Sequence, residues 1–101
     1  MNMREIQKMQ QRLMKMQEEL EATTFTGTAG GGAVTIAMNG KFEITAVEID
    51  PEAFNAEDIA ELEVMVLAAA KDAHTKATDA QQKLTSNLAG GMNLPNIPGL
   101  F

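Results

Sequence analysis

The start of the chain carries apolar residues at alternating intervals of three and four, the seam of a heptad repeat. The seam residues are Ile6, Met9, Leu13, Met16 and Leu20. The positions between them hold mainly Gln, Lys, Arg and Glu, which favour helices, and residues 3–22 contain neither Gly nor Pro. The spacing therefore predicts a helix over residues 3–22, about 30 Å long at 1.5 Å per residue, whose apolar seam needs a surface to meet.

Residues 24–50 show the alternation of β-strands. Apolar side chains occupy every second position over residues 34–38, and Asn39-Gly40 then favours a two-residue type I′ turn, because both of its positions need a positive φ. In the returning segment the apolar residues change phase, which predicts a bulge near residues 45–46, although partial burial of both faces would give the same pattern. With a short strand over residues 25–29, the segment predicts a three-stranded antiparallel meander.

A second helix is predicted over residues 55–89, with Asn55 as its N-cap and no Gly or Pro inside it. Helices longer than about 25 residues are typical of coiled coils or projecting arms. A break near residues 71–75 is the alternative, and the sequence leaves both open. Residues 90–101 form an apolar tail rich in Gly and Pro, which we expect to be flexible or to dock on the protein's own dimer or on a partner. One domain is therefore expected over residues 1–89.

A chain of 101 residues buries only a modest core by itself. A three-stranded sheet also leaves edges with unpaired backbone groups. Joining two sheets edge to edge across a two-fold axis closes such edges and enlarges the core, and two-fold homodimers are the commonest oligomers. The expected fold class is therefore α+β, with a helix, a three-stranded antiparallel β-meander and a long helix, assembled as a two-fold homodimer with projecting helical arms.

Composition argues against several kinds of function. The chain has no Cys and a single His, His74, so we expect no metal site and no cofactor, and we interpret His74 as an exposed helix residue. No apolar run approaches the roughly 20 residues that span a bilayer, and the N-terminus lacks the apolar stretch of a signal peptide, which favours a cytoplasmic protein without a membrane partner. No nucleophile with a partnered base is evident, so we expect neither an enzyme nor a small-molecule substrate.

The glycine-rich segment 27–32 is not a recognisable phosphate loop. Ala33-Val34 stands where a Walker loop has Lys followed by Ser or Thr, and a strand follows where a dinucleotide fingerprint needs a helix. A KH-type loop joins helices and usually carries basic residues, and this segment does neither. We therefore interpret it as a bend or bulge where two backbones approach closely.

The charge of the chain is unevenly distributed. Its formal net charge is −6, yet residues 1–16 hold four basic side chains and one acidic side chain. The basic residues are Arg4, Lys8, Arg12 and Lys15. Their spacing places them on one side of the predicted helix, away from the seam. A merely solvated face is the ordinary interpretation, but the scarcity of acidic partners favours phosphate binding, and salt screens the distant acidic residues over about 8–10 Å.

Six segments, taken in order, are typical of one protein family: residues 9–20, 27–34, 39–40, 49–51, 66–70 and 94–101. Together they resemble the YbaB/EbfC family of bacterial nucleoid-associated proteins. The resemblance implies a homodimer whose sheets join and whose terminal helices project like tweezers, and which binds DNA with weak sequence preference. By position it assigns the DNA contact to Arg4, Lys8, Arg12 and Lys15, with Lys76 and Lys83 as weaker candidates. The arm is less basic, and the remainder more acidic, than a strong DNA binder would have.

The function expected on these grounds is a nucleoid-associated protein that binds double-stranded DNA as a homodimer, mainly through phosphate contacts, in nucleoid organisation and gene regulation. The alternative is a non-enzymatic adaptor or chaperone-like dimer that uses its helical arms and apolar tail to hold another protein. A DNA gel shift that compares the natural chain with a variant lacking the basic stripe distinguishes the two.

Overall fold

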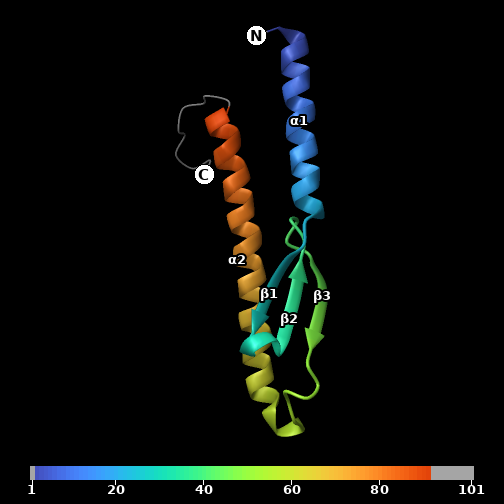
Figure 1. Cartoon of the computed structure of the whole chain (residues 1–101), viewed down its shortest axis with the longest axis vertical. Helices are drawn as coiled ribbons and strands as arrows, with labels where there is room; N and C mark the ends of the chain where they lie inside the picture. The colour runs from blue at the N-terminus through green and yellow to red at the C-terminus, as the bar shows by residue number, and fades with distance from the viewer. Residues whose placement is uncertain (1, 92–101) are drawn as a thin grey trace.

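A computed structural model describes residues 2–91 of the chain, with side chains as far as residue 87. The elements follow in the order α1 (Met3–Ala22), β1 (Phe25–Ala29), β2 (Val34–Met38), β3 (Ile44–Ile49) and α2 (Ile59–Gly91), with 3-10 turns η1 (Gly30–Gly32) and η2 (Ala56–Asp58). This is the predicted helix, meander and long helix (Figure 1). The second helix is continuous through residues 71–75, and it runs two residues into the predicted tail. Residues 92–101 of that tail lie outside the described residues.

The sheet is antiparallel in the order β1-β2-β3. Ala37 pairs with Ala46 and Met38 pairs with Ile44, so Thr45 is the extra residue of a bulge. The bulge prediction is therefore confirmed, and the extra residue explains the change of phase along the returning strand.

The type I′ turn prediction is wrong. Of residues 39–43 only Phe42 has a positive φ, of 64°. The Asn39 side chain accepts hydrogen bonds from the backbone N–H groups of Lys41 at 2.9 Å and Glu43 at 3.1 Å, which closes a longer loop. Gly40 is required for a different reason, because a Cβ atom there would collide with the carbonyl oxygen of Leu20. Close approach to α1, and not turn geometry, selects this glycine.

The core lies between the sheet and residues 62–77 of α2. Its buried side chains are Val34, Ile36, Met38, Ala69, Ala73 and Ala77. Gly27 of β1 lies against the α2 backbone so closely that a Cβ atom would collide with the Ala69 oxygen and the Ala73 nitrogen. Small residues on both sides therefore allow the helix to pack tightly across β1 and β2. The expected bend at the glycine-rich segment is also present, since Gly30, Gly31 and Gly32 all have positive φ.

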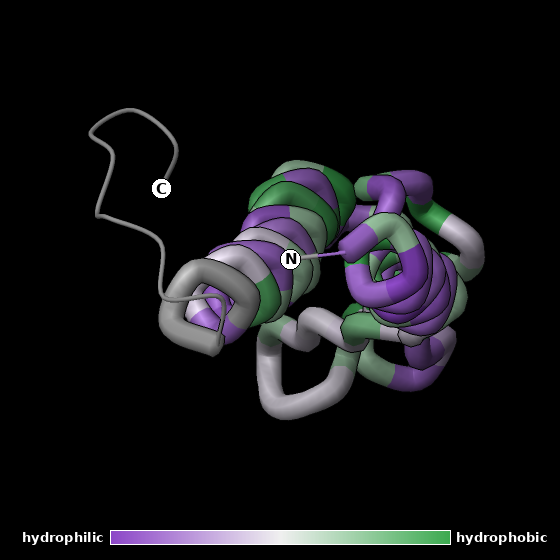
Figure 2. Tube along the Cα trace, turned by 90° about the horizontal axis from the view of Figure 1, so that it is seen from above, coloured by the Kyte–Doolittle hydropathy of each residue, from purple (hydrophilic) through white to green (hydrophobic). Residues whose placement is uncertain are grey.

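α1 is held mainly at its C-terminal end. None of its residues is buried, and the Gly40 N–H group donates a hydrogen bond to the Glu21 carbonyl at 3.3 Å. Together with the second half of α2, α1 extends beyond the sheet, and the two helices run antiparallel (Figure 1). Seen along the long axis, α1 is mostly hydrophilic, whereas hydrophobic residues gather in the first half of α2 (Figure 2). The molecule thus measures 65 × 25 × 16 Å, with α1 as an arm on a compact body.

Candidate nucleic-acid interface

The basic stripe of α1 consists of Arg4, Lys8, Arg12 and Lys15, and all four side chains are exposed. At 100° per residue these positions cover an arc of about 80°, centred roughly 125° from the centre of the apolar seam. The structure therefore brings the four cations together on one face of one helix. In the part of the chain with described side chains, the salt bridges join Lys41 to Glu21 and Lys76 to Asp72, so no stripe residue is neutralised by an ion pair.

The tip of the arm adds to the positive potential of the stripe. Asn2 caps α1 by accepting a hydrogen bond from the Glu5 N–H group at 2.9 Å. The helix dipole places partial positive charge at this end, and Arg4 lies in the first turn beside it. The Glu5 carboxylate is the acidic group of the first turn and offsets part of this field. The tip is also the part of α1 farthest from the sheet (Figure 1).

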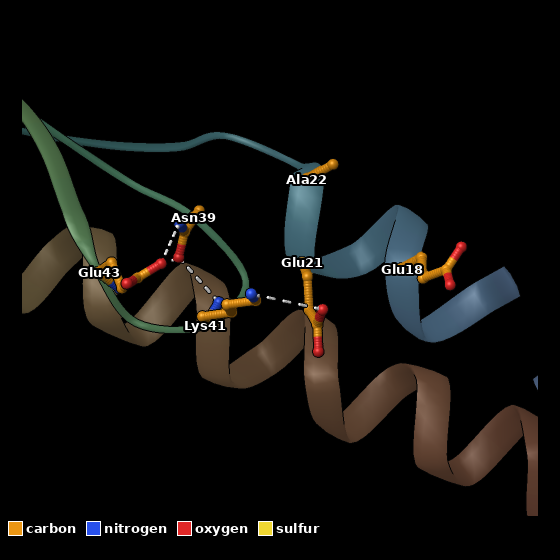
Figure 3. A pocket seen from close by; sticks show the side chains of 6 residues that line it. All are labelled: Glu18, Glu21, Ala22, Asn39, Lys41 and Glu43. Carbon is orange, nitrogen blue, oxygen red and sulfur yellow. Dashed lines mark hydrogen bonds and ion pairs between the residues drawn. The ribbon is translucent and has the colours of Figure 1, made fainter. Parts of the chain in front are cut away.

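The base of the arm has the opposite charge. An open hollow of about 290 Å³ lies between the end of α1 and the β2–β3 loop, and its lining is shown in Figure 3. The lining residues are Glu18, Glu21, Ala22, Asn39, Lys41 and Glu43. Three of them are carboxylates, and the single cation, Lys41, lies 4.0 Å from Glu21. Phosphate would be repelled here, so the part of α1 that suits an anion is its outer part.

The chain is similar to known proteins over nearly its whole length. The sequence profile of the YbaB/EbfC DNA-binding family matches residues 1–92. The chain belongs to this family. It is 46% identical to a nucleoid-associated protein of Dictyoglomus thermophilum, over 98% of this chain and 93% of the relative, and 46% identical to one of Pelotomaculum thermopropionicum, over 98% and 91%.

The fold has a counterpart among solved structures. The crystal structure of an uncharacterised Helicobacter pylori protein matches with a TM-score of 0.71 at 22% identity, over 87% of this chain and 97% of that one. At this identity the likeness concerns the fold alone. Within the described part of this YbaB/EbfC chain, neither helix is long and apolar enough to cross a membrane. The same residues hold no group of three or more His, Asp or Glu side chains suited to a metal ion.

The two weaker candidates lie apart from the stripe, on α2. Lys76 reaches the sheet, where its ammonium group donates a 2.7 Å hydrogen bond to the Thr26 carbonyl and lies 3.4 Å from the Asp72 carboxylate. Lys83 is exposed on the half of α2 that extends beyond the sheet. Lys76 is therefore already engaged by its own chain, whereas Lys83 is available at the surface of this YbaB/EbfC protein.

Sequence reasoning missed two contacts of α2. Asp72 accepts a 3.1 Å hydrogen bond from the Thr28 N–H group, and this bond, followed by the Lys76 ammonium group, lowers the pKa of the Asp72 carboxyl group below its usual value. His74 is exposed, as expected, but its ring is 5.0 Å from that of Phe42 in the β2–β3 loop. Asp72 and Lys76 are four residues apart on the helix and form an ion pair, but nothing in the sequence indicates the strand that they contact.

Proposed function

We propose that this YbaB/EbfC protein binds double-stranded DNA as a homodimer through its α1 arms, mainly by phosphate contacts with little sequence preference, and so contributes to nucleoid organisation and gene regulation in the cytoplasm. The observation that carries the proposal is a stripe of four exposed cations on a projecting helix, none of which forms an ion pair with another described residue. Lys and Arg side chains of this kind bind the phosphate backbone and release condensed counterions. Because the acidic groups are concentrated at the base of the arm and in the body, salt screens them from a duplex at the tip.

The uncovered edge of the sheet supports the homodimer. All six residues of β3 are exposed, since α2 packs on β1 and β2. The β3 strip, defined as Ile44, Val47 and Ile49, pairs with Met38, Ile36 and Val34 respectively, and so lies on the same face of the sheet as the core. Its side chains are nevertheless 42–56% exposed. An apolar strand edge of this kind is a liability in a monomer, and a second copy that covers it removes the liability.

For a dimer, the number of phosphate contacts sets the salt dependence of DNA affinity. Two arms with four cations each offer up to about eight phosphate contacts, and each contact contributes about −0.9 to the slope of log affinity against log salt. Lys83 would add contacts if the duplex also reaches α2. No side chain of the stripe needs to read a base, so we expect similar affinity for duplexes of unrelated sequence.

The test is the DNA affinity of Arg4→Gln/Lys8→Gln/Arg12→Gln/Lys15→Gln, measured by gel shift and fluorescence anisotropy at low salt. We expect affinity to fall by at least about 100-fold, because up to eight contacts are lost per dimer. The matched comparison is Lys8→Gln/Lys15→Gln against Lys41→Gln/Lys71→Gln, which removes two lysines from the arm or two from the body. An equal loss in both pairs, with every variant dimeric by sedimentation, contradicts the arm as the contact. Undiminished binding by the four-fold variant contradicts it too and favours the adaptor alternative.

A further inference from the structure

The two edges of the sheet differ in whether their outward backbone groups are already bonded. At the β1 edge the Thr26 carbonyl accepts a hydrogen bond from Lys76 at 2.7 Å, and the Thr28 N–H group donates one to Asp72 at 3.1 Å. At the β3 edge, no hydrogen bond of the described residues joins an α2 side chain to the backbone of the strand. A strand from another molecule would therefore find β1 occupied at its centre and β3 open along its length.

The β1 contacts form a clamp, defined as Asp72 and Lys76 together. The two residues are one turn apart on α2 and form an ion pair at 3.4 Å, so each holds the other in position over the strand. Between their two backbone partners lies Gly27, whose missing side chain brings the α2 backbone against β1 and the clamp within reach. The same hydrogen bond from Thr28 lowers the pKa of Asp72, because it stabilises the ionised carboxylate.

We propose that the Asp72–Lys76 clamp closes the β1 edge to other chains, so that the sheet accepts a second copy of this protein only along β3 and assembly stops at the dimer. The inference rests on the homodimer of the proposed function and adds the reason why its interface is at β3. A strand that adds to β1 must displace both bonds and leave a carboxylate and an ammonium group beside its own backbone. A strand that adds to β3 meets open backbone groups and the apolar β3 strip.

The closed β1 edge limits the number of chains that the assembly can contain. A dimer joined along β3 still has two β1 edges, one at each end of the joined sheet. If those edges could also pair, dimers would add to dimers and the assembly would grow without closing. Charged side chains at an edge are a known means by which proteins prevent such growth.

The experiment compares the clamp variant Asp72→Ala/Lys76→Ala with the control Asp79→Ala/Lys83→Ala by sedimentation velocity over a concentration series. The control removes the same two charges, at the same spacing, from the part of α2 beyond the sheet, and Ala preserves the helix. We expect the control to remain a dimer and the clamp variant to form species of at least twice the dimer mass as concentration rises. A clamp variant that is folded by circular dichroism and remains a dimer throughout overturns the inference. If it does not fold, Lys76→Met, which keeps the Asp72–Thr28 bond, is measured by the same criterion.

A second measurement separates this inference from the proposed homodimer. Val47→Lys places a charge in the β3 strip, and we expect it to give a folded monomer. Adding Asp72→Ala/Lys76→Ala to Val47→Lys should restore association, now through β1. A natural chain that sediments as a monomer contradicts the homodimer itself. A dimeric natural chain, with a triple variant that is folded and monomeric, contradicts only the role of the clamp.

Discussion

The arm and the body of this molecule differ in how they are stabilised. α1 has no buried residue and depends on its own hydrogen bonds, its N-cap and its attachment at Gly40. The body is built on a close approach of backbones, with three buried alanines of α2 facing Val34, Ile36 and Met38. Charged residues are therefore denser in the arm, where no side chain is fully buried. The comparison indicates that the arm can change its charge with little effect on folding, whereas the body tolerates little change in side-chain volume.

The largest effect on stability is expected from adding volume at Gly27. Gly27→Val places a branched side chain where a Cβ atom alone collides with the Ala69 and Ala73 backbone, which cannot rotate away. We expect the free energy of unfolding to fall by at least about 3 kcal/mol, at the upper end of overpacking costs. The measurement is chemical denaturation followed by circular dichroism. The matched control is Thr26→Val, which adds Val to the exposed face of the same strand and should change stability by no more than about 0.5 kcal/mol. Equal effects in the two variants would contradict close backbone packing at Gly27.

A smaller and local effect is expected at the tip of the arm. Asn2→Ala removes the cap that accepts from the Glu5 N–H group, and caps of this type contribute about 1 kcal/mol. Amide hydrogen exchange in the first turns of α1 should accelerate about fivefold, while exchange in β2 and the first half of α2 stays unchanged. Asn2→Asp, which preserves the cap, is the control and should exchange like the natural chain. Acceleration throughout the body would show that arm and body unfold together, and would contradict their separate stabilisation.

The smallest effect on stability is expected from the clamp, and it depends on pH. Hydrogen bonding to Thr28, then to Lys76, lowers the pKa of Asp72 in the folded chain below its usual value near 3.8. The carboxylate therefore stabilises the folded state at pH values above the unfolded pKa, and this contribution is lost as pH falls through the lowered pKa. The difference in thermal stability between the natural chain and Asp72→Ala should be constant near neutral pH and should disappear in strong acid. Asp79→Ala is the control, and a difference that grows on acidification contradicts the assignment.

Much of this fold follows from patterns that the residues carry locally. The heptad spacing predicted α1, the alternation over residues 34–38 predicted β2, and the change of phase predicted a bulge near residues 45–46. The type I′ turn failed because Gly40 is selected by contact with α1, a neighbour that local rules do not include. The sequence also could not predict that α2 is continuous, since residues 71–75 are compatible with a helix or a break.

The sequence could predict which residues make up the candidate site, but not which of them are engaged by contacts within the folded chain. The stripe follows from helical spacing alone, and its role in DNA binding stays a prediction. The use of Lys76 at β1 could not be predicted, because its contact with Thr26 joins positions 50 residues apart. Local sequence shows the charge of each side chain, whereas tertiary contacts decide which charged side chains remain available to bind DNA.

The salt dependence of DNA binding tests the central claim most directly. The slope of log affinity against log salt is measured for the natural chain, for Lys8→Gln/Lys15→Gln and for Lys41→Gln/Lys71→Gln on one duplex. We expect a slope no steeper than about −7 for the natural chain, shallower by up to about 3.6 when two lysines are removed from each arm, and unchanged when the body lysines are removed. A slope that does not respond to the arm lysines, or that responds equally to the body lysines, contradicts phosphate binding by α1.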